Sequence, residues 1–426
     1  MVNMLPTAAD NGARLAAILP SGLAAIARGQ GKDPRAVLAH ASAPGSFDDL
    51  DVSLVPELRS FVLIVVDGLG HANLAARKGH APTLTGLQQR RIETVAPSTT
   101  GAALTAITTG RLPGEHGLAG YRIRHPEFGL RATLSEWDGI TDVRSWQRAT
   151  PLFAQAREVG ARPVVIGRPA HEEGGLTRAI LSDADYLSGQ RIDDRFAIAS
   201  QTLRAAAAGP AQESTLIYLY VDELDRAAHE HGWESSEWVR RLEQLDAALA
   251  DFLRALPGGV GVAVTADHGI IDVPAEQHVL LDSVPGLLDG VVEIGGEPRF
   301  RALYLAENGA EADPALIAEV RDRIAAAEGD RAWVFTRDEA ITADVFGPVA
   351  PEVAPRLGDV FIAARKRVAY YVSADTPSAR SLVGQHGSFS EDERGVPLAL
   401  AGALAGTGFT ALVTRVAALR GVALAG

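Results

Sequence analysis

Residues 61–70 read FVLIVVDGLG, and this stretch decides the fold class of the chain. Its first six residues, 61–66, are apolar and mostly β-branched without polar alternation, which is typical of a strand buried on both faces of a parallel sheet. Three further runs have the same character, at 163–166, 215–221 and 261–265. In open parallel sheets, ligands bind at the carboxyl ends of the strands, so Asp67 stands at a position where function is expected.

Helical segments separate these strands along the chain. They are predicted at 147–159, 193–208 and 234–256. Strand–helix alternation of this kind predicts an α/β fold with a doubly wound, mostly parallel central sheet and helices on both faces.

Residues 281–375 have a different pattern. Two strands are predicted at 299–306 and 359–364, with an amphipathic helix at 314–327 between them. We interpret this region as an inserted α+β subdomain. Residues 1–280 then form the α/β core with an N-terminal helical arm, and residues 376–426 return to the core. A short hairpin is predicted over residues 121–134.

The composition limits the classes of function. Apolar residues make up 47% of the 426 residues and charged residues 22%, which is typical of a folded chain. Because there is no cysteine, disulfides, thiolate metal sites and catalytic thiols are excluded. The 53 acidic and 40 basic residues give a net charge of −13, which argues against a protein that wraps nucleic acid.

Neither end of the chain carries a clear targeting or membrane signal. The first 29 residues have no basic region ahead of their apolar stretch, which Pro20 interrupts, so no cleaved signal peptide is expected. Residues 395–414 are uncharged and long enough to span a bilayer. They are rich in Ala and Gly and contain Pro397, so we predict a core strand and helix instead. A cytoplasmic protein without a membrane span is expected, and its oligomeric state is left open.

Polar segments follow the predicted strands or begin helices. In residues 96–110, APSTTGAALTAITTG, Thr100 and Gly101 stand at a helix entry, where free N–H groups favour an anion. After the strand at 215–221, Asp225 and His229 are four apart, which places both on one face of a helix. The other two segments are Asp267-His268-Gly269, after the strand at 261–265, and Gly384-Gln385-His386-Gly387.

Each segment alone is as well explained by a turn, a helix cap or a surface pair. Together they supply six oxygen and nitrogen ligands suited to zinc, namely Asp67, Asp225, His229, Asp267, His268 and His386. Six ligands and one hydroxyl suffice for two adjacent four-coordinate ions. Three carboxylates and one threonine alkoxide also balance the charge of two divalent cations, so we predict two metal ions, most consistent with Zn²⁺.

The ordered motifs VVDG, PSTTG, TG-x-x-P-x-x-HG, D-x-x-x-H-x-x-G, DHG and G-x-HG resemble those of the alkaline phosphatase superfamily. Within it, the chain is similar to the nucleotide pyrophosphatase/phosphodiesterase family over residues 61–400. The resemblance implies that Thr100 is a nucleophile that becomes transiently phosphorylated. Thr99 is the alternative nucleophile.

The resemblance also assigns the ligands to two zinc sites. It implies that Asp67, Asp267 and His268 bind the zinc that activates the nucleophile. Asp225, His229 and His386 are implied to bind the second zinc. His116 stands at a structural position of the family, and His231 is left outside the site.

Two positions depart from the family pattern. The family usually has an aromatic residue directly after its threonine and an asparagine two residues further on, where this chain has Gly101 and Ala103. The first departure weakens the case for a nucleotide, and the second removes a hydrogen-bond donor to the phosphoryl group. We predict that the Gly101 N–H supplies that donor. Tyr121 and Trp137 either line the pocket or pack in the core, with core packing the favoured interpretation.

The resemblance implies a phosphodiesterase or nucleotide pyrophosphatase that acts on a small-molecule phosphate ester through a phosphothreonine intermediate. A monoesterase of the superfamily adds a cation beside the nucleophile, whereas the nearest basic residue downstream of Thr100 is Arg111, beyond the helix. The alternatives are a phosphomonoesterase, a hydrolase of phosphonates such as phosphonoacetate, and an inactive metal-binding or nucleotide-sensing scaffold.

Overall fold

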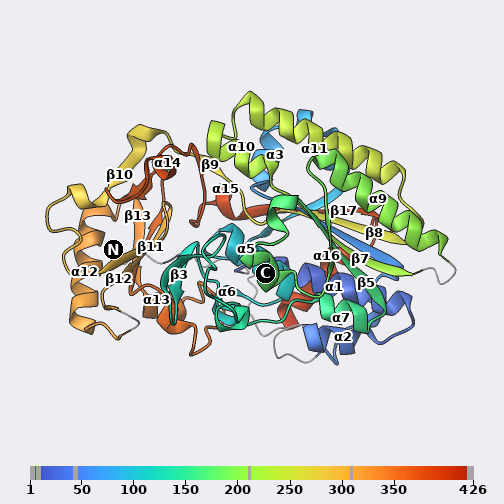
Figure 1. Cartoon of the computed structure of the whole chain (residues 1–426), viewed down its shortest axis with the longest axis horizontal. Helices are drawn as coiled ribbons and strands as arrows, with labels where there is room; N and C mark the ends of the chain where they lie inside the picture. Colours follow the sequence, from blue (N-terminus) through green and yellow to red (C-terminus); the bar gives the residue numbers. More distant parts are fainter. Residues whose placement is uncertain (1–4, 6–10, 42–46, 210–212, 308–309, 420–426) are drawn as a thin grey trace.

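The structure is a computed structural model that describes residues 5, 11–41, 47–209, 213–307 and 310–419 (Figure 1). Seven strands of the described chain form the central sheet, in the order β2-β17-β8-β1-β7-β5-β6. Five of them are parallel: β8 (Val260–Thr265), β1 (Ser60–Val66), β7 (Ser214–Val221), β5 (Ala161–Gly167) and β6 (Asp185–Ser188). The strand β17 (Gly395–Gly402) runs antiparallel to β8 and to β2 (Gln88–Glu93). The mostly parallel sheet confirms the predicted fold class.

Helices cover both faces of this sheet (Figure 1). On one side lie α9 (Ile192–Ala208), α10 (Glu223–His231) and α11 (Ser236–Arg254). On the other lie α1 (Ala13–Gly29), α7 (Phe153–Glu158) and α16 (Phe409–Leu419). All seven residues of β1 are buried between the two layers, as its unbroken apolar sequence predicts.

Two local predictions have clear outcomes. The helix predicted at 147–159 is wrong in its first half, because α7 begins only at Phe153. Pro151 accounts for this, since proline lacks an N–H and is not accommodated inside a helix. The prediction for residues 395–414 is confirmed, because β17 and α16 cover this segment. Among the described residues there is no helix that is both long and apolar enough to cross a membrane.

A second, antiparallel sheet lies beside the central one (Figure 1). Its order is β11 (Glu293–Glu297), β12 (Phe300–Tyr304), β14 (Val360–Ala364) and β13 (Ala332–Thr336), and α12 (Pro314–Glu328) packs on it through Val320 and Ile324. The division into a core at 1–280, an insert at 281–375 and a return at 376–426 stays a prediction. Residues 1–4 and 6–10 of the predicted N-terminal arm lie outside the described residues.

The remaining elements connect these layers. The predicted hairpin is present as β3 (Arg122–His125) and β4 (Gly129–Ala132), which pair antiparallel. Two small pairs join distant segments: β10 (His278–Leu280) with β15 (Ala369–Tyr371), and β16 (Gly384–Gln385) with β9 (Ile271–Asp272). The shorter helices are α2 (Pro34–Ala41), α3 (His71–Ala76), α4 (Pro82–Gly86), α5 (Thr100–Thr109), α6 (Pro113–His116), α8 (Gly175–Ile180), α13 (Arg337–Thr342), α14 (Pro377–Arg380) and α15 (Glu391–Arg394).

Candidate active site

Three neighbouring strands deliver the predicted ligands to one edge of the sheet. Asp67 directly follows β1, and the pair Asp267-His268 follows β8 after one intervening residue. Asp225 lies in the first turn of α10, just after β7. Because β8, β1 and β7 are adjacent and parallel, their carboxyl ends meet at one edge. The parallel order of these strands is what brings residues 67, 225 and 267 together.

The potential ligand atoms form two groups that share one residue. Atoms of Asp225, His229 and His386 lie within 4.8 Å of one another, and so do atoms of Asp67, Asp225 and His268. Asp267 adjoins the second group, with its Oδ2 3.6 Å from His268 Nε2. The structure therefore gathers all six predicted ligands and makes Asp225 the residue common to both groups.

The three histidines are held in the orientation that a metal ligand requires. The Nδ1 atom of His229 lies 2.7 Å from Gly384 O, that of His386 lies 2.8 Å from Ser98 O, and that of His268 lies 3.1 Å from Gly269 O. A carbonyl oxygen only accepts hydrogen bonds, so each Nδ1 donates a proton to its carbonyl and each Nε2 is the ring atom left for the ligand cluster. This arrangement of a backbone partner behind a ligand nitrogen is general in metal sites.

Two of the three carboxylates, those of Asp67 and Asp267, are buried with too little positive charge around them, whereas burial alone would raise the pKa of Asp225 but His229 lowers it. Burial and the charge of Asp225 raise the pKa of Asp67, and burial and Asp67 raise that of Asp267 well above its usual range. Burial alone would lower the pKa of His268, but the adjacent Asp267 and Asp67 raise it to about 10. Asp67 Oδ1, Asp225 Oδ1 and Asp267 Oδ2 are buried and accept no hydrogen bond from the described residues. Three free carboxylate oxygens and three oriented imidazoles are a donor set that fits divalent cations.

Thr100 stands at the start of α5, against the same cluster. Its Oγ1 lies 3.1 Å from His268 Nε2, and the residue is buried. Helix α5 begins at Thr100, so the Gly101 N–H belongs to the first turn, which has free donors. A side chain at position 101 has no room, because its Cβ would lie 2.5 Å from Thr133 Oγ1. Glycine therefore replaces the family's aromatic residue for a steric reason.

Ser98 ties the threonine segment to the loop that carries His386. Ser98 N donates to Gly387 O at 3.1 Å, and its Oγ donates to Ser388 O at 2.8 Å. Gly387 has φ of +125°, and a Cβ there would lie 2.6 Å from the Glu297 side chain. Position 387 thus needs glycine for both conformation and space.

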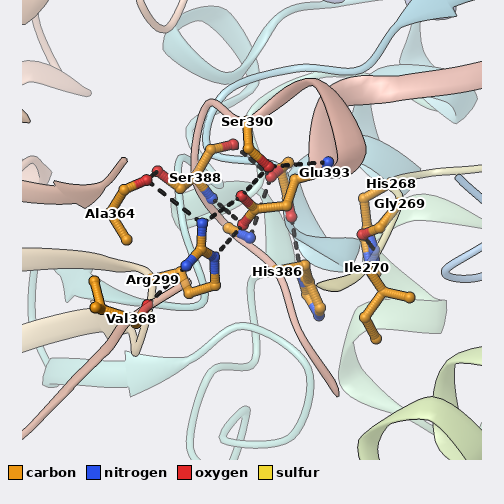
Figure 2. A network of polar contacts seen from close by, with 12 residues as sticks. His268, Gly269, Ile270, Arg299, Ala364, Val368, His386, Ser388, Ser390 and Glu393 are labelled. Carbon is orange, nitrogen blue, oxygen red and sulfur yellow. Dashed lines mark hydrogen bonds and ion pairs between the residues drawn. The ribbon is translucent and has the colours of Figure 1, made fainter. Parts of the chain in front are cut away.

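A buried ion pair supports the His386 loop from behind, as Figure 2 shows. Arg299 and Glu393 have fully buried side chains, joined by two bonds of 2.7 Å. Glu393 Oε1 also accepts from Ser388 N at 3.0 Å, and its backbone carbonyl accepts from Gly269 N at 2.8 Å. Glu393 therefore holds the two loops that follow His268 and His386.

The site opens into a cavity of about 500 Å³. Thr100, Asp67, Asp225, His229 and His386 line it, whereas Asp267 and His268 lie wholly buried behind them. Tyr121 is one of the residues that line this cavity, so the prediction that it packs in the core is wrong.

Other residues near the ligands have outcomes of their own. Trp137 packs in the core as favoured, with its ring 4.7 Å from that of Trp146. His116 lies outside the site, since its ring contacts Ala102 O at 3.2 Å and Leu118 N at 3.1 Å. His231 lies outside too, 3.6 Å from Glu230.

Sequence reasoning missed three residues of the site. Tyr220 donates its hydroxyl to Asp67 Oδ2. Glu297 lines the cavity from β11, and burial raises its pKa to about 7. Tyr218 lines the cavity two residues before Tyr220. Both tyrosines belong to the predicted strand at 215–221, and their spacing of two residues would have placed them on the same face of the sheet. For Glu297, nothing nearby in the sequence indicates a role.

The match to a family model decides the relationship of this chain. A model of type I phosphodiesterases / nucleotide pyrophosphatases matches residues 61–389, well over half of the chain. The chain belongs to this family. Hydrolysis of phosphoesters is the reaction class that the family description names.

Curated relatives agree with this assignment. Ectonucleotide pyrophosphatase/phosphodiesterase family member 1 of Rattus norvegicus is 23% identical over 260 residues, which cover 58% of this chain and 28% of the relative. The Homo sapiens member 1 is 22% identical over 248 residues, covering 55% and 26%. The chain thus matches about a quarter of the length of these relatives.

Solved structures share the fold. Murine ectonucleotide pyrophosphatase / phosphodiesterase 5, an inactive threonine-to-alanine variant in complex with AMP, matches with a TM-score of 0.61 at 16% identity, over 86% of this chain and 96% of that one. Phosphonoacetate hydrolase from Sinorhizobium meliloti 1021 in complex with phosphonoformate also gives 0.61, at 19% identity, over 85% and 97%.

Proposed function

We propose that this protein is a two-metal phosphodiester hydrolase that uses Thr100 as its nucleophile. The observation that carries the proposal is the convergence of six carboxylate and imidazole ligands on the Thr100 hydroxyl at the carboxyl edge of a parallel sheet. Family membership supports the reaction class, since the family comprises phosphodiesterases and nucleotide pyrophosphatases.

We assign the residues to two cation sites. Asp67, Asp267, His268 and Thr100 would form one site, and Asp225, His229 and His386 the other. Asp225 also lies within 4.8 Å of the ligand atoms of Asp67 and His268, so it would join the two sites. Zinc is our proposal for both, and two such cations would supply the charge that lowers the hydroxyl pKa and offsets the charge on the reacting phosphoryl group.

The chain's own residues then perform two displacements. In the first, Thr100 Oγ1 bonds to phosphorus while the bond to the departing oxygen breaks, which leaves a phosphorylated threonine. The N–H of Gly101 donates to a phosphoryl oxygen from the first turn of α5. It takes the place of the family's asparagine, because Ala103, which is fully buried in that helix, has no side-chain donor. In the second displacement, water attacks phosphorus and releases Thr100.

The charges around the cavity favour a diester over a monoester. A monoester carries about one more negative charge, which calls for a cation beside the nucleophile. Arg226 is the one arginine or lysine that lines the cavity in the described chain, and its side chain pairs with Asp222 at 3.8 Å. Arg111 pairs with Glu115 at 3.5 Å and is not among the lining residues.

The test compares bis-p-nitrophenyl phosphate with p-nitrophenyl phosphate, using zinc-loaded wild-type protein and the variants Thr100→Ala and Thr99→Ala. We expect faster cleavage of the diester. Loss of the nucleophile should lower kcat by roughly 10³-fold or more, and Thr99→Ala should keep most of the activity. A preference for the monoester would contradict the diester proposal, and retained activity in Thr100→Ala would contradict the assigned nucleophile. Cleavage of neither ester by metal-loaded protein would favour a phosphonate substrate or an inactive scaffold.

A cytoplasmic location stays a prediction from the sequence. The substrate is proposed to be a small-molecule phosphate ester, and the oligomeric state is left open.

A further inference from the structure

Part of the cavity lining is aliphatic. These side chains line the same cavity as Thr100 and Asp225, so a group attached to a phosphorus atom at Thr100 has hydrocarbon beside it. We call this part of the cavity the apolar chamber, and its aliphatic lining is Leu104, Leu134, Val165, Leu176, Ile180 and Leu181. These side chains come from α5, the segment after β4, β5 and α8 with the residue that follows it.

One buried hydroxyl in this lining has no protein partner. Tyr218 on β7 is 1% exposed and lies in register with Val165 of β5. Its hydroxyl makes no hydrogen bond to the described residues. The two other tyrosines on the adjoining wall are satisfied, because Tyr220 donates to Asp67 and Tyr186 donates to Arg168 O at 2.8 Å. A buried donor without a partner is costly, so Tyr218 is suited to a ligand acceptor.

Two polar groups bordering the chamber are already engaged. Thr177 donates its hydroxyl to His171 O, and Asp222 Oδ2 accepts from Arg168 and His171 at 3.1 and 3.2 Å. Asp222 Oδ1 accepts no hydrogen bond from the described residues but lies 3.7 Å from Arg195. A nucleoside brings several ribose and base groups that need partners, more than these walls supply. Gly101 also provides no aromatic ring beside the nucleophile, because Thr133 fills that space.

Resting on the proposed function, we infer that the apolar chamber binds a hydrocarbon substituent of the phosphoester that carries one acceptor for the Tyr218 hydroxyl. The substituent is an alkyl or aryl group rather than a nucleoside. Binding removes apolar surface from water against the aliphatic wall, while Tyr218 selects the group that bears an acceptor.

The test measures binding without turnover. Methyl-, butyl- and hexylphosphonic acids are titrated calorimetrically into zinc-loaded wild-type protein, because their carbon–phosphorus bonds leave no ester to hydrolyse. We expect the affinity to rise by about fourfold for each added methylene until the chamber is filled. Equal affinity for the three ligands would overturn the inference.

Two variants locate the effect. Leu176, half-buried in α8, is changed to Asn, and its matched control is Leu253→Asn, a half-buried helical leucine outside the cavity. We expect Leu176→Asn to abolish most of the gain in affinity that longer alkyl groups give, whereas the control variant keeps this gain. Identical behaviour of the two variants would contradict the assigned wall.

Tyr218→Phe tests the acceptor. It should lower the affinity for 4-nitrophenylphosphonic acid about fivefold, since one hydrogen bond is removed, and leave the affinity for phenylphosphonic acid unchanged. Equal effects on both ligands would exclude the hydroxyl contact. Because every titration is independent of catalysis, failure to cleave bis-p-nitrophenyl phosphate would contradict the proposed function while chain-length dependence still decides this inference.

Discussion

The two halves of the cavity are built in different ways. In the ligand half, helix α10 and the loops after the strands present ligand side chains whose orientation is fixed from behind, as with His229 of α10 against Gly384 O and His386 against Ser98 O. In the apolar chamber, Leu176 and Val165 are ordinary wall residues of a helix and a strand. The contrast teaches that changes in the first half should alter metal content and rate, whereas changes in the second should alter affinity.

The largest expected effect concerns Asp225, because it belongs to both ligand groups. Asp225→Asn should lower zinc content from about two ions per chain toward none and reduce diester cleavage by roughly 10³-fold or more. His386→Ala, in one group only, should lose about one ion. The metal content is measured by mass spectrometry of dialysed protein. Loss of a single ion from Asp225→Asn would break the shared-ligand account.

The next effect concerns the support behind the ligand half. Removing one partner of a buried ion pair leaves an uncompensated charge, so Glu393→Gln should lower the free energy of unfolding by about 3–5 kcal/mol. The matched control is Asp251→Asn, which breaks an exposed pair with Arg254 and should cost less than about 1 kcal/mol. Urea unfolding of the metal-free proteins gives both values. Similar losses of unfolding free energy in the two variants would show that the buried ion pair contributes no more to stability than the exposed one.

The fold and the ligand half were largely predictable, whereas the chamber was not. Unbroken apolar runs such as 61–66 mark buried parallel strands, and Asp67 and Asp267-His268 stand in short motifs beside them. The chamber residues come from separate segments, and a leucine at 104 or 176 has the same pattern whether it faces a cavity or the core. Glu297 likewise reaches the site only through the packing of β11. The shape of the cavity depends on tertiary packing, and the local spacing of residues in the sequence does not reveal it.

The smallest expected effect concerns Glu297, which joins the site from the second sheet. Burial raises its pKa to about 7, above its ordinary value of 4.5. Between these pH values the unfolded chain releases a proton that the folded chain retains, so stability falls as pH rises through this window. Relative to Glu297→Gln, the wild type should lose on the order of 1–3 kcal/mol from pH 4.5 to pH 7. A difference that stays constant with pH, in urea unfolding, would rule out the raised pKa.

The most direct test of the central claim is to trap the covalent intermediate. Zinc-loaded protein is mixed with bis-p-nitrophenyl phosphate, quenched in acid within milliseconds and digested with trypsin, which releases residues 92–111 as one peptide. Fragmentation by mass spectrometry should place a p-nitrophenyl phosphoryl group on Thr100. An adduct on Ser98 or Thr99, or turnover by the Thr100→Ala variant at the wild-type rate, would contradict the account.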